Sequence, residues 1–231
     1  MSAKTEAIFA AITSHDIPTL RRCLKVGREL ESTNEYGRTP LAQASLLGFA
    51  DAVLEILQYR PQLETSDEDG NTALILAASF DRNDVVKHLL HAGADVNGRN
   101  RLTGGTALLV APAAVSVSLC PDCVSVLLAA GADINLQNGA GITALMRAAD
   151  NDRAECATAL LKAGALIDLA DSKGRTALFH AVRARSANVC EVLIQAGANV
   201  NFEDSRQDTP SMEAQRSGSD SIRHVFNKRH S

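Results

Sequence analysis

Two cysteines three positions apart are the residues with the clearest chemical potential, in the segment Cys120-Pro121-Asp122-Cys123. A pair with this spacing can supply half of a zinc site or act as a redox dithiol. Zinc would need two more ligands, and no second pair follows at zinc-site spacing; redox use normally accompanies a βαβ pattern, which the chain lacks. Pro121 suits the first position of a helix, which would place Cys120 at a helix N-terminus that favours a thiolate. Cys120 is therefore a candidate reactive thiol, and a thiol-redox or metal-responsive protein that uses Cys120 and Cys123 remains an alternative.

The other residue types that support catalysis do not form a constellation along the chain. Ser, His and Asp residues are scattered, no serine lies in a nucleophile elbow, and Gly104-Gly105 reads as a turn rather than a phosphate-binding loop. The six histidines do not have the spacing of a ligand cluster. The sequence thus predicts a non-enzymatic protein with no cofactor and no metal site.

Charge and composition narrow the classes of partner. The chain has 231 residues and a formal net charge of −4, whereas a non-specific nucleic-acid binder normally carries a basic surface. No stretch approaches the ~20 apolar residues of a membrane span, and the first residues lack the apolar segment of a signal peptide. Five scattered cysteines without a secretory signal favour a reducing compartment. We expect a cytoplasmic protein, with the nucleus as an alternative, that contacts neither nucleic acid nor membrane.

A threonine recurs along the chain at intervals of 33, 34, 37, 33 and 33 residues, and most of its copies follow a glycine two positions earlier. A fixed period of this length indicates stacked repeats rather than a single central core. One repeat cannot bury its own apolar face, so neighbours must cover it. The recurring positions are Thr39, Thr72, Thr106, Thr143, Thr176 and Thr209.

Residues 68–100 show what one unit contains. Gly70 lies at the tip of a turn, and Thr72 can cap the following helix by accepting a backbone N–H. Apolar residues within 74–78 supply the buried side of that helix, and Asp81-Arg82-Asn83-Asp84 breaks it and caps a second helix. The unit therefore reads as helix, turn, helix and hairpin-like loop.

The pattern Gly-x-Thr-Pro/Ala-Leu, two helices and then Gly-Ala-Asp-Val-Asn resembles the ankyrin repeat. The resemblance implies an all-α fold, an ankyrin-repeat solenoid of stacked helix-turn-helix units with hairpin-like loops and polar terminal caps. We expect a single domain over residues 1–231, divided into a capping repeat at 1–34, repeats at 35–67, 68–100, 101–138, 139–171 and 172–204, and a capping repeat at 205–231.

The sequence departs from the family at the histidine that usually follows Thr-Pro-Leu. The bond that this histidine gives between turns should therefore be lost, with apolar packing in its place. The replacing residues are Ala42, Ile75, Leu109, Met146, Phe179 and Met212. The resemblance also marks Asn97 and Asn135 as similar to asparagines that are hydroxylated in such repeats, although the same side chains can satisfy turn hydrogen bonds.

Residues 101–138 form a longer unit than their neighbours, with four extra residues between its threonine and its later glycine. Pro112 falls inside the expected first helix and should break, kink or restart it. Insertions in repeat arrays lie in loops on one face, often the binding face, so this unit either contributes to binding or tolerates an insertion that contacts nothing. Cys123 aligns with valines of other units and reads as a core residue.

In proteins that this chain resembles, the turn tips and the outward side of the first helix line a concave groove that binds other proteins. We therefore expect one or more protein partners, a monomeric chain, and a role as adaptor, inhibitor or assembly chaperone. Acidic tips in the third unit and basic tips in the sixth either orient a partner with its acidic end toward this chain's C-terminus or are ordinary solvated charges. The expected groove residues are Tyr36, Arg38, Leu46, Leu47, Glu68, Asp69, Asn71, Phe80, Ile142, Asp150, Asn151, Lys173, Arg175, Arg183 and Arg185, flanked by Glu35, Ser79, Leu102, Thr103 and Ala113.

The apolar members of this set carry two interpretations. Leu46, Leu47 and Phe80 are apolar where a groove should face solvent. They form either a contact patch for the partner or packing between repeats.

Overall fold

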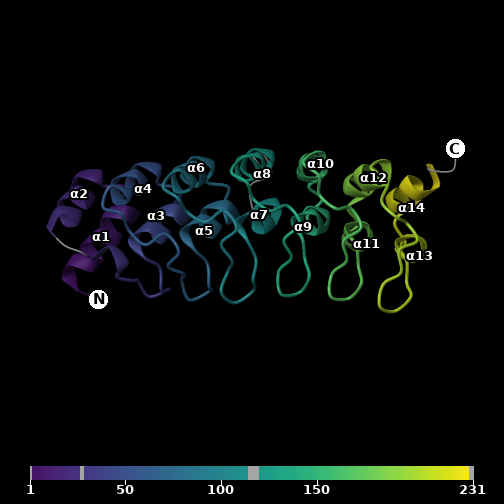
Figure 1. Ribbon diagram of the computed structural model, residues 1–231, viewed down its shortest axis with the longest axis horizontal. Helices are drawn as coiled ribbons and strands as arrows, with labels where there is room; N and C mark the ends of the chain where they lie inside the picture. The colour runs from purple at the N-terminus through teal and green to yellow at the C-terminus, as the bar shows by residue number, and fades with distance from the viewer. Residues whose placement is uncertain (1, 27–28, 114–119, 229–231) are drawn as a thin grey trace.

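The computed structural model describes residues 2–26, 29–113 and 120–228, and these segments form helices without any β-strand. Within them, seven helix pairs stack side by side into an elongated solenoid whose termini lie at opposite ends (Figure 1). An outer row of helices runs along one edge, and an inner row lies beside the hairpin loops, which all project to the same side. The expected all-α solenoid of stacked helix pairs is therefore confirmed.

The two rows alternate along the chain. The inner row contains α1 (Ala3–Thr13), α3 (Pro40–Leu47), α5 (Ala73–Ser79), α7 (Ala107–Val110), α9 (Ala144–Asp150), α11 (Ala177–Ala184) and α13 (Pro210–Arg216). The outer row contains α2 (Ile17–Val26), α4 (Ala50–Leu57), α6 (Asn83–His91), α8 (Cys120–Ala129), α10 (Ala154–Lys162), α12 (Ala187–Gln195) and α14 (Asp220–Asn227). Two short 3-10 helices are η1 (Glu29–Glu31) and η2 (Ala111–Ala113).

Each inner helix from α3 to α13 begins directly after one of the recurring threonines. In five of these six helices the threonine hydroxyl accepts the backbone N–H three residues on, as Thr39 does from Ala42 at 3.2 Å. The bond satisfies one of the N–H groups that a helix start leaves without an intrahelical partner. Thr176 is the exception, because its buried hydroxyl has no hydrogen bond in the described part of the chain.

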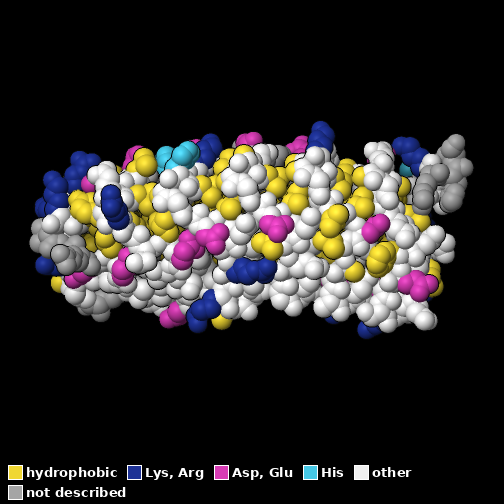
Figure 2. All heavy atoms as spheres, in the orientation of Figure 1, with side chains coloured by type: hydrophobic (Ala, Val, Ile, Leu, Met, Phe, Trp, Pro, Cys, Tyr) yellow, Lys and Arg dark blue, Asp and Glu magenta, His cyan; other side chains and the backbone are white. Residues whose placement is uncertain are grey.

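The core is one continuous apolar layer between the two rows. Alanines such as Ala44, Ala77 and Ala148 are fully buried on the inner helices and let neighbouring helices approach closely. The five outer helices α4, α6, α8, α10 and α12 contribute one large side chain at the same position of their repeats, fully buried in every case: Ile56, Leu89, Leu127, Leu160 and Leu193. Along one long side of the solenoid, hydrophobic side chains also reach the surface as an interrupted band beneath the outer helices (Figure 2).

Backbone hydrogen bonds join each hairpin tip to the tip before it. The N–H of Glu68 donates to the carbonyl of Tyr36 at 3.1 Å, and the same bond recurs at four later tips. Within each tip an Asn or Asp side chain accepts N–H groups of its own turn, as Asn138 does from Ala140 and Ile142. Main-chain atoms thus hold the tips in register, in the pairs Arg101–Gly70, Gly139–Thr103, Ser172–Ala140 and Ser205–Lys173.

A second ladder joins the segments that leave the outer helices. The side-chain oxygen of Asn97 accepts the N–H of Asp133 at 2.8 Å, and that of Asn135 accepts the N–H of Leu166 at 2.9 Å. Both asparagines therefore satisfy a backbone donor in the next repeat, which gives each a structural role. Carboxylates fill the same role elsewhere in the array, in the pairs Glu31–Gln62, Glu64–Asp95 and Asp168–Asn199.

The long repeat has the shortest helix of the inner row among the described residues. Helix α7 ends at Val110 after four residues, and the chain continues as η2, which contains Pro112. Proline has no N–H and its ring crowds the preceding turn, so the α-helical bond pattern stops there. The predicted break at Pro112 is confirmed, whereas most of the insertion, residues 114–119, lies outside the described residues.

The turn between α5 and α6 differs in part from its prediction. The helix does break there, with Asp81 at a positive φ of 56°. The predicted cap is wrong, because the residue before α6 is Arg82 and no side chain bonds to the start of that helix. Asp81 is instead buried, and neither carboxylate oxygen forms a hydrogen bond with a residue that the structure describes. Burial is the main reason why the pKa of this carboxyl is raised.

The tip contacts predict a strong effect of a methyl group at Gly141. Its φ is +77°, and a Cβ atom would lie 2.7 Å from the Ser172 nitrogen and 2.9 Å from the Asp171 Cα. Gly141→Ala should lower the free energy of unfolding by about 3 kcal/mol, because backbone strain and a clash with rigid main chain add together. Urea unfolding followed by circular dichroism measures this change.

Gly164→Ala is the matched control, because its φ of +93° is similar but no atom lies within 4 Å of its Cβ position. This variant should lose only about 1 kcal/mol from the left-handed backbone. Equal losses in the two variants would contradict the close packing of successive tips.

Candidate functional site

The surface that positions the expected groove residues is called here the inner face: the hairpin tips together with the exposed sides and ends of the inner helices. Every residue of the expected set lies on a tip, on an inner helix or directly after one. The exposed members are Tyr36, Glu68, Asp69, Phe80, Asp150, Asn151, Lys173, Arg183 and Arg185. The half-buried members are Arg38, Leu46, Leu47, Asn71, Ile142 and Arg175.

A pocket of about 370 Å³ lies at the N-terminal end of the inner face. Tyr36 lines it from a hairpin tip, with 53% of its surface exposed, and Phe9 lines it from α1. The Arg38 guanidinium carbon lies 5.0 Å from the centre of the Tyr36 ring, within range of a cation–π interaction. The remaining lining residues are Thr13, Asn34, Glu35 and Gln43. The pocket therefore offers an aromatic surface with polar edges.

A larger pocket of about 570 Å³ lies at the C-terminal end, between the last two inner helices and their tips. Lys173, Arg175 and Arg183 of the expected set line it. The capping repeat supplies the other wall, including Arg206 and Arg216, which the sequence analysis did not include. Arg206 follows Lys173 by one 33-residue period, so the repeat alignment contained the signal for it.

Several expected groove residues hold the scaffold together. Arg38 pairs with the buried carboxylate of Asp67 at 3.3 Å, and the side chain of Asn71 bonds to that of Asn100 at 2.7 Å. Leu47 and Ile142 pack against the core. These contacts give Arg38, Asn71, Leu47 and Ile142 a structural role in the stack.

The apolar patch expected from Leu46, Leu47 and Phe80 is divided by the structure. Phe80 is 41% exposed at the end of α5, which leaves it available for contact. Leu47 is packed against the core and Leu46 is half-buried, with its carbonyl accepting a bond from Arg82 Nε at 3.2 Å. Leu102, at the tip of the long repeat, is the most exposed of the large hydrophobic side chains in the described segments, at 63%.

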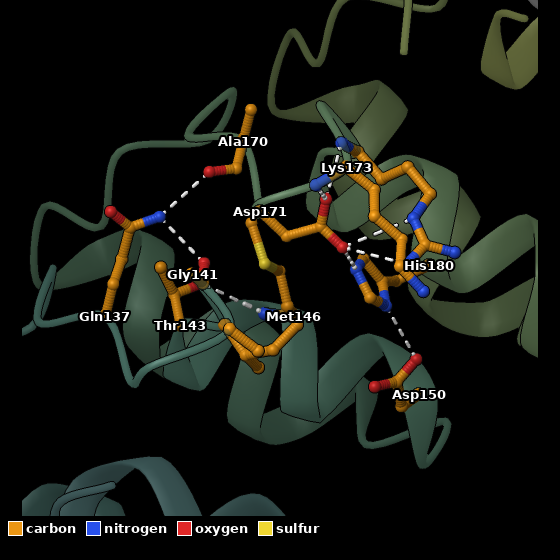
Figure 3. A network of polar contacts seen from close by, with 12 residues as sticks. Gln137, Gly141, Thr143, Met146, Asp150, Ala170, Asp171, Lys173 and His180 are labelled. Carbon is orange, nitrogen blue, oxygen red and sulfur yellow. Dashed lines mark hydrogen bonds and ion pairs between the residues drawn. The ribbon is translucent and has the colours of Figure 1, made fainter. Parts of the chain in front are cut away.

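A polar network centred on Asp171 joins the repeat that contains α9 to the repeat that contains α11 (Figure 3). Its carboxylate, whose side chain is 2% exposed, accepts the backbone N–H groups of Lys173 and Arg175 at 2.8 and 2.9 Å. The Arg175 guanidinium donates to the same carboxylate at 3.1 and 3.2 Å, and His180 Nε2 lies 3.2 Å from it. Burial acts to raise the pKa of Asp171, but these donors and the nearby positive charge hold it below its usual value.

His180 carries the network into the preceding repeat. Its Nδ1 lies 2.9 Å from the carboxylate of Asp150, at the end of α9. Gln137 adds a second link between repeats, because its amide donates to the carbonyls of Gly141 and Ala170 at 2.7 and 2.9 Å (Figure 3). The ring of His180 is thus held between two acidic residues, which also accounts for one of the exposed groove residues, Asp150.

This arrangement corrects the expectation that bonds from histidine between turns are lost throughout. Phe179 does occupy the family's histidine position and is buried, but His180, one position later, connects a tip to the neighbouring inner helix. The spacing of the six histidines along the sequence indicated no ligand cluster and gave no role to His180. The linking role of His180 was hidden for two reasons. The residue lies one position beyond the family's histidine, and its two carboxylate partners are 9 and 30 residues away in the sequence.

The cysteines are divided between the core and a disulfide. Cys123 and Cys190 are buried free thiols, and Cys23 is a half-buried free thiol. Burial raises the pKa of both Cys123 and Cys190 to about 12, so neither is a thiolate at neutral pH. The core position predicted for Cys123 is confirmed. Cys156 is disulfide-bonded, which is not typical of the reducing compartment expected from the sequence.

The Cys120 prediction is only partly covered. Helix α8 does begin at Cys120, but the side chain lies outside what the structure describes, so its reactivity stays a prediction. The described residues contain no group of three His, Cys, Asp or Glu side chains placed to hold a metal ion. Among the same residues, no helix has the length and apolar character needed to cross a bilayer.

Comparison with known proteins identifies the repeat. The sequence matches the family described as ankyrin repeats (3 copies) over residues 7–100 and 113–204. The ankyrin repeat domain of Bcl-3, described as a unique member of the IkappaB protein family, superposes with a TM-score of 0.80 and 25% identity, covering 96% of this chain and 97% of that domain. This chain belongs to the ankyrin repeat family.

Curated relatives share part of the chain. The E3 ubiquitin-protein ligase KEG of Arabidopsis thaliana is 37% identical over 120 residues, which is 52% of this chain and 7% of KEG. Neurogenic locus notch homolog protein 1 of Homo sapiens is 34% identical over 130 residues, which is 55% of this chain and 5% of that protein. The chain thus spans less than a tenth of either relative. Ankyrin repeats are modules for protein–protein interaction and are typically non-enzymatic.

Asp171→Asn should destabilise the protein strongly, because it leaves the Arg175 guanidinium and the His180 ring beside a neutral amide in place of a carboxylate. We expect a loss of about 3 kcal/mol in the free energy of unfolding near pH 7. Because the pKa of Asp171 is lower in the folded protein than in the unfolded chain, this carboxylate stabilises the wild type at pH values above the pKa of the unfolded chain. That stabilisation is lost as the pH falls through the pKa of the folded state. The variant should therefore show a smaller loss of stability than the wild type between neutral and acid pH in urea unfolding.

The control is Asp150→Asn, which changes the more exposed carboxylate on the same histidine ring. This variant should lose only about 1 kcal/mol of the free energy of unfolding, because solvent screens the pair between Asp150 and His180. Equal effects of the two substitutions would show that Asp171 is not the centre of the network.

The buried thiols should be protected from reagents in the folded protein. At pH 8, Cys123 and Cys190 should react with a thiol reagent only as fast as the protein unfolds, whereas half-buried Cys23 reacts sooner; peptide mapping assigns each site. Because the folded pKa is about 12 against an ordinary value of 9.0, the stability that these thiols add is complete below pH 9 and is lost toward pH 12. Rapid native labelling of Cys123 would contradict its burial and revive the thiol alternative.

Proposed function

We propose that this chain is a non-enzymatic adaptor, inhibitor or assembly chaperone that holds a protein partner on its inner face. The observation that carries the proposal is the placement of exposed aromatic and apolar side chains on successive tips and inner helices. Tyr36, Phe80 and Leu102 are all exposed and come from three consecutive repeats. Large exposed side chains repeated on one face are typical of protein contact surfaces.

The scaffold supports this role through its rigidity. The tips are fixed by two sets of main-chain hydrogen bonds, within each turn and between neighbouring turns. A surface that is already ordered loses little conformational entropy on binding, so more of the contact energy appears as affinity. Solenoids of stacked repeats offer such surfaces along their whole length.

The partner that fits this face is a protein, and the chain acts as a monomer. The net charge of −4 opposes non-specific binding to nucleic acid. The free thiols support a cytoplasmic or nuclear location, and the disulfide at Cys156 weighs against it. The groove set remains the one expected from the sequence, with Tyr36, Phe80, Glu68 and Asp69 as contact residues and Arg38 and Arg175 as supports.

The double variant Tyr36→Ala, Phe80→Ala tests the proposal. A partner recovered by affinity purification should bind this variant at least about tenfold more weakly, because both side chains present large surfaces that a contact would bury. Isothermal titration calorimetry with the purified partner measures the change. Arg175 is left intact, since its loss would unpair the buried carboxylate of Asp171.

Leu54→Ala with Leu166→Ala is the matched control, because both leucines are exposed but lie on α4 and after α10, away from the inner face. The control should bind as the wild type does, and both variants should melt at similar temperatures. If the control substitutions weaken binding and Tyr36→Ala, Phe80→Ala does not, the partner binds another surface.

A further inference from the structure

The C-terminal pocket has more positive charge than its own residues neutralise. Its lining contains five basic and three acidic side chains around the buried ring of Phe179. The basic residues are Lys173, Arg175, Arg183, Arg206 and Arg216. The chain as a whole carries a net charge of −4, so this pocket has the opposite sign from the molecule around it.

Two of the five cations are committed to carboxylates. Arg175 pairs with Asp171 at 3.1 Å, and Arg216 pairs with Asp208 at 2.7 Å. The side chains of Lys173, Arg183 and Arg206 are exposed and make no ion pair or hydrogen bond with any described residue. Three cations that converge on one pocket without partners repel one another, and an anion would relieve that repulsion.

The acidic residues of the pocket are engaged elsewhere. One carboxylate oxygen of Asp204 accepts the backbone N–H groups of Arg206 and Asp208 at 2.8 and 3.0 Å. Asp208 is held by Arg216. Glu213 lies in the first turn of α13, where the helix N-terminus favours a negative charge. None of the three forms an ion pair with an uncommitted cation.

The opposite end of the inner face has the reverse polarity. Glu35, Glu68 and Asp69 are exposed on the tips of the second and third repeats. An anionic segment placed along the inner face is therefore repelled at one end and attracted at the other. The charge pattern favours one position and one direction for such a ligand.

We propose that the C-terminal pocket binds a short acidic segment of a protein partner, whose carboxylate or phosphate groups pair with Lys173, Arg183 and Arg206. This inference rests on the proposed function and adds the chemistry of the partner. Phe179 forms the apolar floor, and the ion pairs of Arg175 and Arg216 shape the walls. The three uncommitted side chains supply charge at the rim, which governs the association rate and selectivity.

Fluorescence anisotropy with short labelled peptides tests the proposal on the full chain. The probes are a peptide of alternating Glu and Ser, a peptide of the same length with Gln in place of Glu and phosphoserine in place of every second Ser, a neutral Gln–Ser peptide and a Lys–Ser peptide. Because a phosphoserine carries about two negative charges, the two acidic peptides have a similar total charge. We expect the wild type to bind both acidic peptides and neither of the others, with affinity that falls as salt rises. Tighter binding of the phosphoserine peptide at equal charge assigns the site to phosphorylated segments, and equal binding assigns it to acidic segments in general.

The key variant is Lys173→Glu, Arg206→Glu, at two tip positions whose side chains form no ion pair with any described carboxylate. It should bind the acidic peptides at least about tenfold more weakly. The matched control is Arg22→Glu, Lys162→Glu, at exposed positions on α2 and α10. Because both variants lower the net charge equally, the control should stay within about twofold of the wild type if the pocket, rather than overall charge, is responsible.

Three results would overturn the inference: no binding of either acidic peptide, equal weakening in the two variants, or equally tight binding of a single-stranded oligonucleotide of the same charge. The last would make the pocket a general polyanion site. If the acidic peptides fail to bind but Tyr36→Ala, Phe80→Ala still weakens the binding of a captured partner, only the proposed acidic ligand is wrong and the proposed function stands. Loss of both effects would remove the inner face as a binding surface.

Discussion

The structure depends on the fact that no repeat satisfies its own backbone or covers its own apolar flank. Each tip donates an N–H to the tip before it, as Glu68 does to Tyr36. Each outer helix buries one large side chain, such as Leu89, against its neighbours. Because these contacts join only adjacent repeats, stability is a chain of nearest-neighbour interfaces, and the molecule extends in one direction. The long shape and the single exposed inner face both follow from that constraint.

The same constraint separates the residues that build the scaffold from those that are free to vary. Tip spacing is fixed by main-chain atoms and by an acceptor such as Asn138 or Asp171 in each turn. The remaining tip side chains contribute little to the stack, so their chemistry can change from repeat to repeat. That freedom allows Tyr36 at one end, acidic tips beside it and a basic pocket at the other end. Polarity along the inner face is thus compatible with a uniform fold.

Two sites show where the stack departs from uniformity. Pro112 shortens α7, and the chain continues as a 3-10 turn without loss of the buried leucine at position 127 of the following helix. Asp81, in the turn between α5 and α6 of the preceding repeat, is buried, and its carboxylate has no hydrogen bond within the described residues. Pro112 lies in the long repeat and Asp81 in the repeat before it, so the array tolerates its greatest irregularity at an internal position where neighbours on both sides support it.

The sequence by itself determined the local elements and their order. Thr39 and its successors cap helices by bonds three residues long, and Gly141 takes a positive φ at a turn; both are short-range effects that a periodic pattern records. Only the tertiary structure decided which of the expected groove side chains are bonded within the scaffold and which remain available to a ligand. Arg175 and Asp150 look like surface charges in the sequence, yet Asp171 and His180 commit them to the scaffold. The C-terminal pocket likewise needs Lys173 and Arg216, which come from successive repeats, to line the same pocket from opposite walls. Such pairings depend on how closely neighbouring units stack, which is set by side chains 30 or more residues apart and is therefore not visible in any local pattern.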